Sequence, residues 1–402
     1  MALRIVSHRP DPAIYSLPWS LPLEEWQEHV VPLPRGLSRH VVRIVRLGEA
    51  VYAVKETTEE MAWREYNLLR NLHRLGLPAV VPHGVVTGRV DASGADLPAA
   101  LITRHLRFAL PYRALFAHGM RTDSLPSLID ALVVLLVRLH IAGFYWGDVS
   151  LSNVLFRRDA GALTAYLVDA ETGELRNELS APIREYDVEV GTQNVYAELL
   201  DLEAGQFVDN VDPHEVVDLI LTRYRDLWNE LTGTEVFDTD QMWRIEQRIA
   251  RLNDLGFDVD ELDVITDFDG EVVRITPCVV ELGHHSRQFR SLTGLDVEDN
   301  QARVLLNDLA AFTAATGMSA EDPMVVANRW LREVYEPIMR LVPPAHRGKL
   351  EGPELFHEIL VHRWYLSERA GHEVDIFATA RDYIDTQLAA RPDEAIASIT
   401  DD

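Results

Sequence analysis

The sequence has almost no cysteine and no long apolar run. Its one cysteine, Cys278, excludes a disulfide within the chain and a metal site built from several thiolates. The longest dense apolar run, Ala131 to Val137, is far too short to cross a bilayer, and no signal-peptide core stands near the N-terminus. We therefore expect a cytoplasmic protein without a membrane span.

Basic residues are scarce as well. Lys and Arg together number 38 against 64 Asp and Glu, which gives a formal net charge of -26. A field of this sign repels nucleic acid and anionic membranes, and no strong basic run offsets it. We therefore expect no nucleic-acid partner.

What the chain does contain is enough apolar sequence for large cores. It has 402 residues, of which 47% are hydrophobic, and this length predicts two or three domains. The sequence contains no internal repeat, and no low-complexity linker divides its N-terminal half from its C-terminal half. We therefore expect a second domain that is docked against the first rather than tethered to it.

The most informative segment runs from Gly143 to Phe156 and reads GFYWGDVSLSNVLF. Asp148 and Asn153 have the spacing of the loop in which an Asp takes a proton from an attacking hydroxyl and an Asn holds Mg²⁺ between nucleotide phosphates. Trp146 stands where that loop usually has His. Upstream, five leucines at helical spacing precede Gly143, a residue type that commonly ends helices: Leu128, Leu132, Leu135, Leu136 and Leu139. A helix therefore delivers this loop.

Two short strands follow the loop. Val154 to Phe156 predicts the first strand and Leu163 to Val168 the second, with a turn between them. The second strand ends at Asp169, whose carboxylate can reach the metal held by Asn153. Glu171 adds a second carboxylate there as an optional ligand. The alternative is that Asp169 and Glu171 only begin a solvated turn.

A lysine and a glutamate complete the pattern upstream. Val41 to Val45 and Ala50 to Glu56 predict a hairpin with Lys55 near its end, where its charge suits nucleotide phosphates. The alternative is a lysine at a strand end that reaches water. The helix from Thr58 to Leu75 carries Glu65 on its apolar stripe. An acid among leucines is costly unless it is paired, so we predict an ion pair between Glu65 and Lys55.

These motifs, in this order, resemble the protein-kinase-like superfamily, and within it the lipopolysaccharide (Kdo) kinase-like group, over about residues 30 to 205. The resemblance implies an α+β fold: a two-lobed kinase-like domain at 1–205, with a β-rich N-lobe (30–106) and a mostly helical C-lobe (107–205). It also implies a C-terminal domain of unknown function at 206–402. The residues themselves predict this domain to be mainly helical, with one helix at 241–255 and a short β insert whose strands are 271–276 and 279–282.

The resemblance also implies roles for single residues. Asp148 would be the catalytic base, Lys55 would contact phosphates and be oriented by Glu65, and Asn153 and Asp169 would bind Mg²⁺. Ala53 and Leu155 would sandwich the adenine of ATP. Under this interpretation the chain is an ATP- and Mg²⁺-dependent phosphotransferase with an unknown hydroxyl-bearing acceptor.

Two departures bear on catalysis. The stretch from Pro34 to His40 has one glycine where protein kinases have G-x-G-x-x-G, so Ser38 or Arg39 would have to assist the phosphate cradle. The segment from Thr172 to Tyr186 is short and lacks Ala-Pro-Glu, which favours a small-molecule or glycan hydroxyl, or autophosphorylation, over a dedicated protein substrate. A pseudokinase that binds nucleotide or a partner without turnover, and a non-kinase scaffold, remain the alternatives.

Other acids, histidines and tryptophans suggest simpler roles. We interpret Asp187 as the acid at the start of a helix to Leu202, although it could brace the catalytic loop. His357 and His362 resemble H-E-x-x-H but are one residue too far apart to share a helix face, so we expect surface histidines. We expect a polar loop at His284 and His285. Four tryptophans lie at helical apolar spacing and are predicted to be core: Trp228, Trp243, Trp330 and Trp364.

Overall fold

The structure is a computed structural model of the whole chain. It describes residues 2–8, 11–31, 40–48, 50–117, 124–208, 211–238, 243–244, 247–248, 257–266 and 272–395. Packing divides the chain into two units: residues 1–157 with 165–224, and residues 158–164 with 225–402. This division falls inside a helix, whereas the predicted domain boundary after residue 205 precedes it and stays a prediction.

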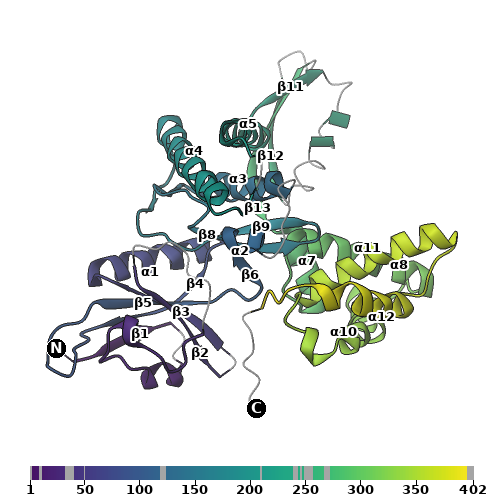
Figure 1. Cartoon of the computed structure of the whole chain (residues 1–402). Helices are drawn as coiled ribbons and strands as arrows, with labels where there is room; N and C mark the ends of the chain where they lie inside the picture. Colours follow the sequence, from purple (N-terminus) through teal and green to yellow (C-terminus); the bar gives the residue numbers. More distant parts are fainter. Residues whose placement is uncertain are drawn as a thin grey trace. The chain divides into compact units, whose positions relative to one another are not determined.

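The first unit opens with a five-stranded antiparallel sheet in the order β1-β4-β5-β3-β2, with one helix, α1, between β3 and β4 (Figure 1). The predicted hairpin is present, because β2 pairs with β3 and Val42 lies opposite Lys55. The bounds are β1 (Arg4–Ser7), β2 (Val42–Leu47), β3 (Ala50–Thr57), α1 (Glu59–Arg74), β4 (Val81–Thr87) and β5 (Ala99–Arg104).

One face of β3 packs against the N-terminal segment. Tyr52 and Val54 are buried in a cluster with Trp19 and Trp26, near the 3-10 helices η1 (Pro12–Ser16) and η2 (Leu23–Glu25). The guanidinium of Arg89, itself buried, holds this segment through the carbonyl oxygens of residues 19 and 21. Since strand side chains alternate, Lys55 points to the other face.

The remainder of the first unit is built around α3, α4 and short strands. The five predicted leucines of α3 are all buried. Gly143 follows this helix at φ 79°, and a Cβ there would lie 2.1 Å from the carbonyl oxygen of Arg176, so glycine is required at this turn. The elements are β6 (Ala109–Pro111), α2 (Tyr112–Ala117), α3 (Leu125–Ile141), β7 (Phe144–Tyr145), β8 (Val154–Asp159), β9 (Ala162–Leu167), β10 (Glu174–Leu175), α4 (Ala181–Ala204) and α5 (Pro213–Thr232).

The second unit is mainly helical and includes a three-stranded antiparallel sheet in the order β11-β13-β12. The two strands predicted at 271–276 and 279–282 form one strand, β13, and β12 and β11 pair with it. The predicted helix at 241–255 lies mostly outside the described residues. The elements are β11 (Glu235–Asp238), β12 (Phe257–Thr266), β13 (Val272–Leu282), α7 (His284–Thr293), α8 (Asp299–Thr316), α9 (Pro323–Trp330), the π-helix η5 (Leu331–Tyr335), α10 (Glu336–Leu341), η6 (Pro344–His346), α11 (Gly352–Ala370), α12 (Ile376–Thr386) and η7 (Leu388–Ala390).

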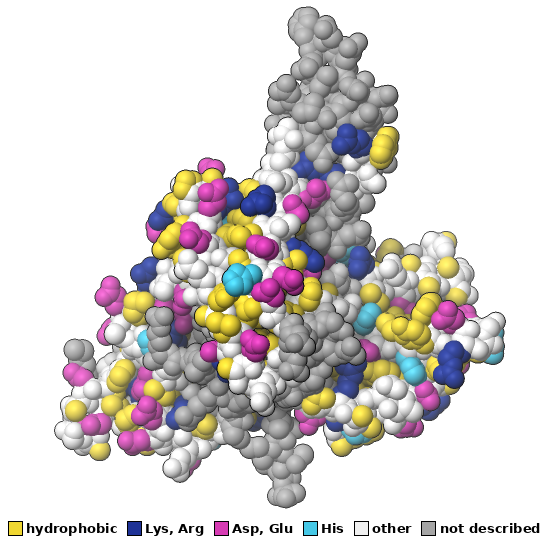
Figure 2. All heavy atoms as spheres, turned by 45° about the horizontal axis from the view of Figure 1, so that its top comes forward, with side chains coloured by type: hydrophobic (Ala, Val, Ile, Leu, Met, Phe, Trp, Pro, Cys, Tyr) yellow, Lys and Arg dark blue, Asp and Glu magenta, His cyan; other side chains and the backbone are white. Residues whose placement is uncertain are grey.

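The α+β class with a β-rich start and a helical finish is therefore confirmed. The expected polar loop at His284 is wrong, because those residues begin α7. No helix in the described parts of the chain combines the length and apolar character needed to cross a bilayer. On the face drawn in Figure 2, acidic side chains are scattered and interspersed with basic ones, so the negative charge is spread over the coloured surface.

The core of the second unit contains one of the four tryptophans. Trp330 is fully buried and packs edge-on against Phe356, while its indole nitrogen donates to Asp308 at 2.8 Å. The prediction of core tryptophans is wrong for Trp243 and Trp364, each 59% exposed, and Trp228 is only partly buried. In α11, position 364 follows the buried Ile359 by five residues, which is about 140° around the helix.

The turn between β8 and β9 packs with the second unit. Asp159 is 3% exposed, and its carboxylate accepts hydrogen bonds from the backbone nitrogen of Gln301 at 2.8 Å and the side chain of Asn300 at 3.0 Å. Glu354 accepts from the backbone nitrogen of Ala160 at 2.8 Å. Residues 158–164 are thus fixed by buried polar contacts with the helical part of their unit.

Replacing Asp159 tests this anchor. Asp159→Asn turns one acceptor oxygen into a donor that faces N–H groups, so we expect the free energy of unfolding to fall by about 2 to 4 kcal/mol. Chemical denaturation monitored by circular dichroism measures this change. Asp296→Asn, at a residue whose side chain is 85% exposed, is the matched control. Equal stability of both variants and wild type would contradict an anchoring role.

Candidate active site

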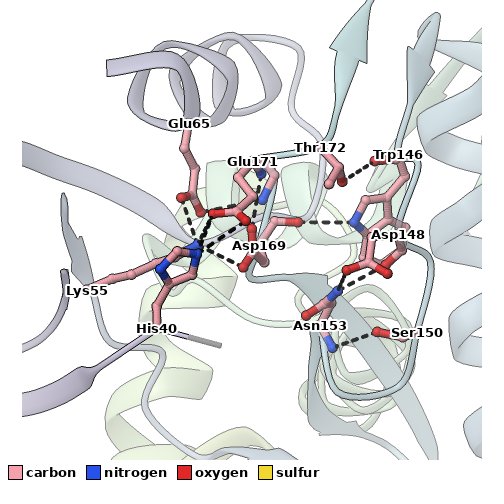
Figure 3. Close-up of polar contacts among 11 residues, drawn as sticks. His40, Lys55, Glu65, Trp146, Asp148, Ser150, Asn153, Asp169, Glu171 and Thr172 are labelled. Atoms are coloured by element: carbon pink, nitrogen blue, oxygen red, sulfur yellow. Dashed lines mark hydrogen bonds and ion pairs between the residues drawn. The ribbon is translucent and has the colours of Figure 1, made fainter. Parts of the chain in front are cut away.

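Four segments of the first unit converge on one group of polar side chains (Figure 3). Lys55 comes from β3 and Glu65 from α1. The loop before β8 supplies Asp148 and Asn153, and the segment after β9 supplies Asp169. The structure therefore brings together the five residues to which the sequence assigned catalytic, phosphate and metal roles; the roles themselves stay predictions.

Lys55 lies at the centre of the group. Its Nζ donates to Glu65 Oε2 at 3.0 Å, to Asp169 Oδ2 at 2.8 Å and to Glu171 Oε2 at 3.0 Å. The Lys55 side chain is 12% exposed and the Glu65 side chain 2%. The predicted ion pair between Lys55 and Glu65 is confirmed, and the alternative of a strand-end lysine that reaches water is wrong.

The charge of this group is unbalanced. Three carboxylates surround one ammonium, so two negative charges are in excess when all four groups are ionised. Burial and the nearby charge of Asp169, against the opposing effect of Lys55, together raise the pKa of Glu65 to about 7. Burial opposes the charged form of Lys55, but Glu65 and Asp169 outweigh it and raise the pKa of that ammonium.

Glu171 contacts both Lys55 and His40, a residue that lies just before β2. The Oε2 of Glu171 lies 3.0 Å from His40 Nε2. Burial opposes ionisation of Glu171, yet the hydrogen bond from Lys55 and the contact with His40 lower the pKa of this carboxyl. Of the single-glycine stretch from Pro34 to His40, only His40 is among the described residues.

The carboxylates fit a divalent cation. Oxygen atoms of Glu65, Asp169 and Glu171 lie within 4.8 Å of one another. Hard cations such as Mg²⁺ prefer oxygen ligands and usually bind one or two carboxylates together with water and phosphate. The excess negative charge and the all-oxygen donor set both suit such an ion.

The loop is organised by its own amide. Asn153 Nδ2 donates to the carbonyl oxygen of Asp148 at 3.0 Å and to its Oδ2 at 3.1 Å (Figure 3). With the nitrogen engaged inside the loop, the amide oxygen is the atom of Asn153 that can bind a cation. Trp146, at the position usually held by His, is fully buried, and its indole donates to the carbonyl oxygen of Asp169 at 3.0 Å. This bond joins the loop to the segment that follows β9.

Asp187 corrects the sequence interpretation. Its helix, α4, begins six residues earlier, at Ala181, so Asp187 is not an N-terminal acid. Its fully buried carboxylate accepts from the backbone nitrogens of Trp146 and Gly147, both at 2.8 Å, and contacts His140 Nε2 at 3.0 Å. Asp187 therefore braces the loop that carries Asp148.

Sequence reasoning missed two further residues of α4. Asn194 Nδ2 donates to Asp148 Oδ1 at 3.2 Å and to the carbonyl oxygen of Val149 at 2.9 Å. Glu198 accepts from the backbone nitrogens of Leu151 and Ser152, both at 2.8 Å. The signal that could have found them is their helical spacing from Asp187.

The adenine positions are less defined. Ala53 in β3 lies opposite Thr103 of β5 and is half-buried, as is Leu155 in β8. Their predicted contact with adenine stays a prediction.

Two histidines of the second unit each contact an aspartate. His362 lies 2.6 Å from Asp382, and His285 lies 2.9 Å from Asp299.

Comparison with known proteins finds two families, each matching a different part of the chain. Residues 44–189 match the lipopolysaccharide kinase (Kdo/WaaP) family, and residues 226–388 match a domain of unknown function (DUF4032). No curated protein matches the chain. The predicted resemblance to the Kdo kinase-like group is thereby confirmed.

Solved structures resemble the chain only distantly. A structure titled "WaaP in complex with acyl carrier protein" is 15% identical, covering 63% of this chain and 99% of that one, with a TM-score of 0.37. An aminoglycoside-3'-phosphotransferase of type VIII is 15% identical, covering 50% and 86%, with a TM-score of 0.35. A structure of the Rad53 kinase domain and SCD2 is 16% identical, covering 39% and 60%, with a TM-score of 0.29.

The pH dependence of stability tests the charge excess. Because the folded pKa of Glu65 is about 7 against 4.5 for the free side chain, the folded state binds this proton more tightly. Protonation of Glu65 therefore stabilises the folded state, fully so below pH 4.5, and this contribution to the free energy of unfolding is lost as the pH rises through 7. At about 1.4 kcal/mol per pKa unit, the loss is at most about 3 kcal/mol.

We therefore expect the melting temperature of wild type, relative to Glu65→Gln, to fall across this window without nucleotide or Mg²⁺. Differential scanning calorimetry at several pH values measures the difference. Glu60→Gln, on the exposed side of α1, is the control and should show no such trend. A difference that rises with pH would be the opposite of this expectation.

The chain thus joins a segment that matches the lipopolysaccharide kinase (Kdo/WaaP) family to a segment that matches a family of unknown function.

Proposed function

We propose that the protein is an ATP- and Mg²⁺-dependent phosphotransferase that acts on a hydroxyl group of a small molecule or glycan. The family match of residues 44–189 supports a phosphotransferase of the kinase-like type. The observation that carries the finer proposal is the convergence of Lys55, Asp148 and Asp169 in one site. Glu65 forms an ion pair with Lys55, and Asn153 donates a hydrogen bond to Asp148.

Each residue has a chemical task under this proposal. Lys55 binds nucleotide phosphates, and Glu65 holds its ammonium in place. Asn153 and Asp169 hold Mg²⁺, which when bound neutralises charge on the phosphates. Asp148 accepts the proton of the acceptor hydroxyl. The hydroxyl oxygen bonds to the γ-phosphorus, and the bond between that phosphorus and the leaving ADP oxygen breaks.

The acceptor class is inferred from the segment after the metal-binding residues. Between Asp169 and the start of α4 at Ala181 the chain forms only the short strand β10, which pairs with β7. Among the described residues of the first unit, a segment of this length offers no extended platform on which a peptide could dock. A small hydroxyl compound or a glycan end is therefore the acceptor we propose.

A pseudokinase is the second candidate, and one contact favours it. Lys55 is engaged by Asp169 and Glu171 as well as by Glu65, so carboxylates occupy donor positions that phosphates would need. A protein that keeps these contacts would bind nucleotide weakly and turn over none. Turnover, rather than binding, separates the two candidates.

Calorimetric titration of ATP with and without Mg²⁺ tests the proposal. We expect Mg²⁺-dependent binding to wild type, at least ten-fold weaker binding to Asp169→Ala because a metal ligand is lost, and near-normal binding to Asp148→Ala. Asp148→Ala should also abolish phosphate release from ATP. Binding without turnover in wild type, after a screen of hydroxyl acceptors, would favour the pseudokinase.

The scarcity of lysine allows a second test. The chain has two lysines, Lys55 and Lys349, and their side chains are 12% and 13% exposed. We expect an acyl-phosphate derivative of ATP to acylate Lys55, and excess Mg²⁺-ATP to suppress this labelling, because the reactive group is delivered where phosphates bind. Peptide mass spectrometry measures both sites, and Lys349 is the internal control. Equal labelling of both lysines, unaffected by ATP, would contradict a phosphate site at Lys55.

A further inference from the structure

One face of α4 contacts the whole catalytic loop. The contacting positions are 187, 191, 194 and 198, which fall within about 60° of one another at 100° per residue. Asp187 binds the start of the loop and Glu198 its end. At Gly191 an added Cβ would lie 2.8 Å from Val149, so the helix backbone comes close to the loop there.

Between these two acids, Asn194 contacts the carboxylate of Asp148 itself. Its Nδ2 donates one hydrogen to Asp148 Oδ1 and the other to the carbonyl oxygen of Val149. Rotating the amide by 180° would set its oxygen against two acceptor oxygens, so both donors fix its orientation. The amide is therefore a rigid contact with the proposed base.

The carboxylate of Asp148 is held by amides alone. Asn153 donates to Oδ2 and Asn194 to Oδ1, and within the part of the chain that the structure describes no Lys, Arg or His forms an ion pair with Asp148. A neutral donor orients a carboxylate through hydrogen bonding without adding a positive charge that would weaken it as a base. Two amides from different segments thus fix both oxygens.

We propose that Asn194 is a positioning residue for phosphoryl transfer: its amide holds Asp148 Oδ1 so that the carboxylate faces the acceptor hydroxyl. This role rests on the proposed function. Asn194 is not a catalytic residue, because it acts through Asp148. Glu198 supports it by fixing the backbone at Leu151 and Ser152, which keeps the loop against the helix.

The test replaces the amide by a carboxylate. Asn194→Asp places a second negative charge beside Asp148, and like charges at this distance favour a shared proton. We expect the acid limb of the pH profile for Mg²⁺-ATP turnover to water to move up by about one pH unit or more. We expect Asn194→Ala to lower kcat by about ten-fold while the KM for Mg²⁺-ATP changes little, because nucleotide contacts remain.

The matched control is the neighbouring Gln193→Glu. It introduces the same charge on the same helix, but Gln193 is exposed and bonds to Glu189 of its own helix. Its pH profile and kcat should equal those of wild type. A shift as large as that of Asn194→Asp would overturn the proposal, since the effect would then come from general charge.

A second readout does not depend on turnover. Carbon-13 NMR of side-chain carboxyls, with the Asp148 signal assigned by its loss in Asp148→Asn, gives the titration midpoint in nucleotide-free protein. Asn194→Asp should raise this midpoint, and Gln193→Glu should not. An unchanged midpoint in Asn194→Asp would overturn the positioning role. Absence of turnover in wild type together with the raised midpoint would instead reject only the proposed function.

Discussion

The ammonium of Lys55, held among three carboxylates, is the interaction on which the site depends. It joins β3 to α1 through Glu65 and to the segment after β9 through Asp169 and Glu171. Removing one partner from such a group leaves the others with uncompensated charge in a poorly hydrated place, so each partner depends on the rest. This mutual dependence favours a single arrangement of the three elements.

The loop that carries Asp148 is positioned by a different set of contacts. Its position comes from hydrogen bonds to one face of α4 and from the indole of Trp146, which donates to the backbone at Asp169. The loop backbone is held by acids, whereas the carboxylate of Asp148 is held by amides. Acids that accept from backbone N–H groups are satisfied without a counter-ion. Among the residues that the structure describes, no positive side chain forms an ion pair with the proposed base, and the backbone of its loop is held in place.

Local patterns were sufficient for much of this site. Glu65 could be paired with Lys55 because an acid on an apolar helix stripe needs a partner, and the buried helix before the loop follows from leucine spacing. The bracing role of Asp187 could only be raised as an alternative, because its partners lie some forty positions earlier in the chain. Asn194 could be linked to the loop only through its helical spacing from Asp187, so its contact with Asp148 was not predicted. Trp364 is the converse case: its apolar spacing predicts a core position, yet it is exposed because it lies about 140° around α11 from the buried Ile359.

The excess of carboxylates bears on how nucleotide and metal would act together. Phosphates can reach Lys55 only if Asp169 and Glu171 release some of its hydrogen-bond donors, and their release leaves negative charge that repels phosphate. Under the proposed function, a divalent cation bound by the released carboxylates would remove this repulsion, so each ligand would favour binding of the other. Because such coupling is reciprocal, the same contacts that hold Lys55 in the nucleotide-free protein would make nucleotide affinity depend steeply on Mg²⁺. Glu171, where protein kinases have glycine, would strengthen that coupling, because it adds one more carboxylate to be neutralised.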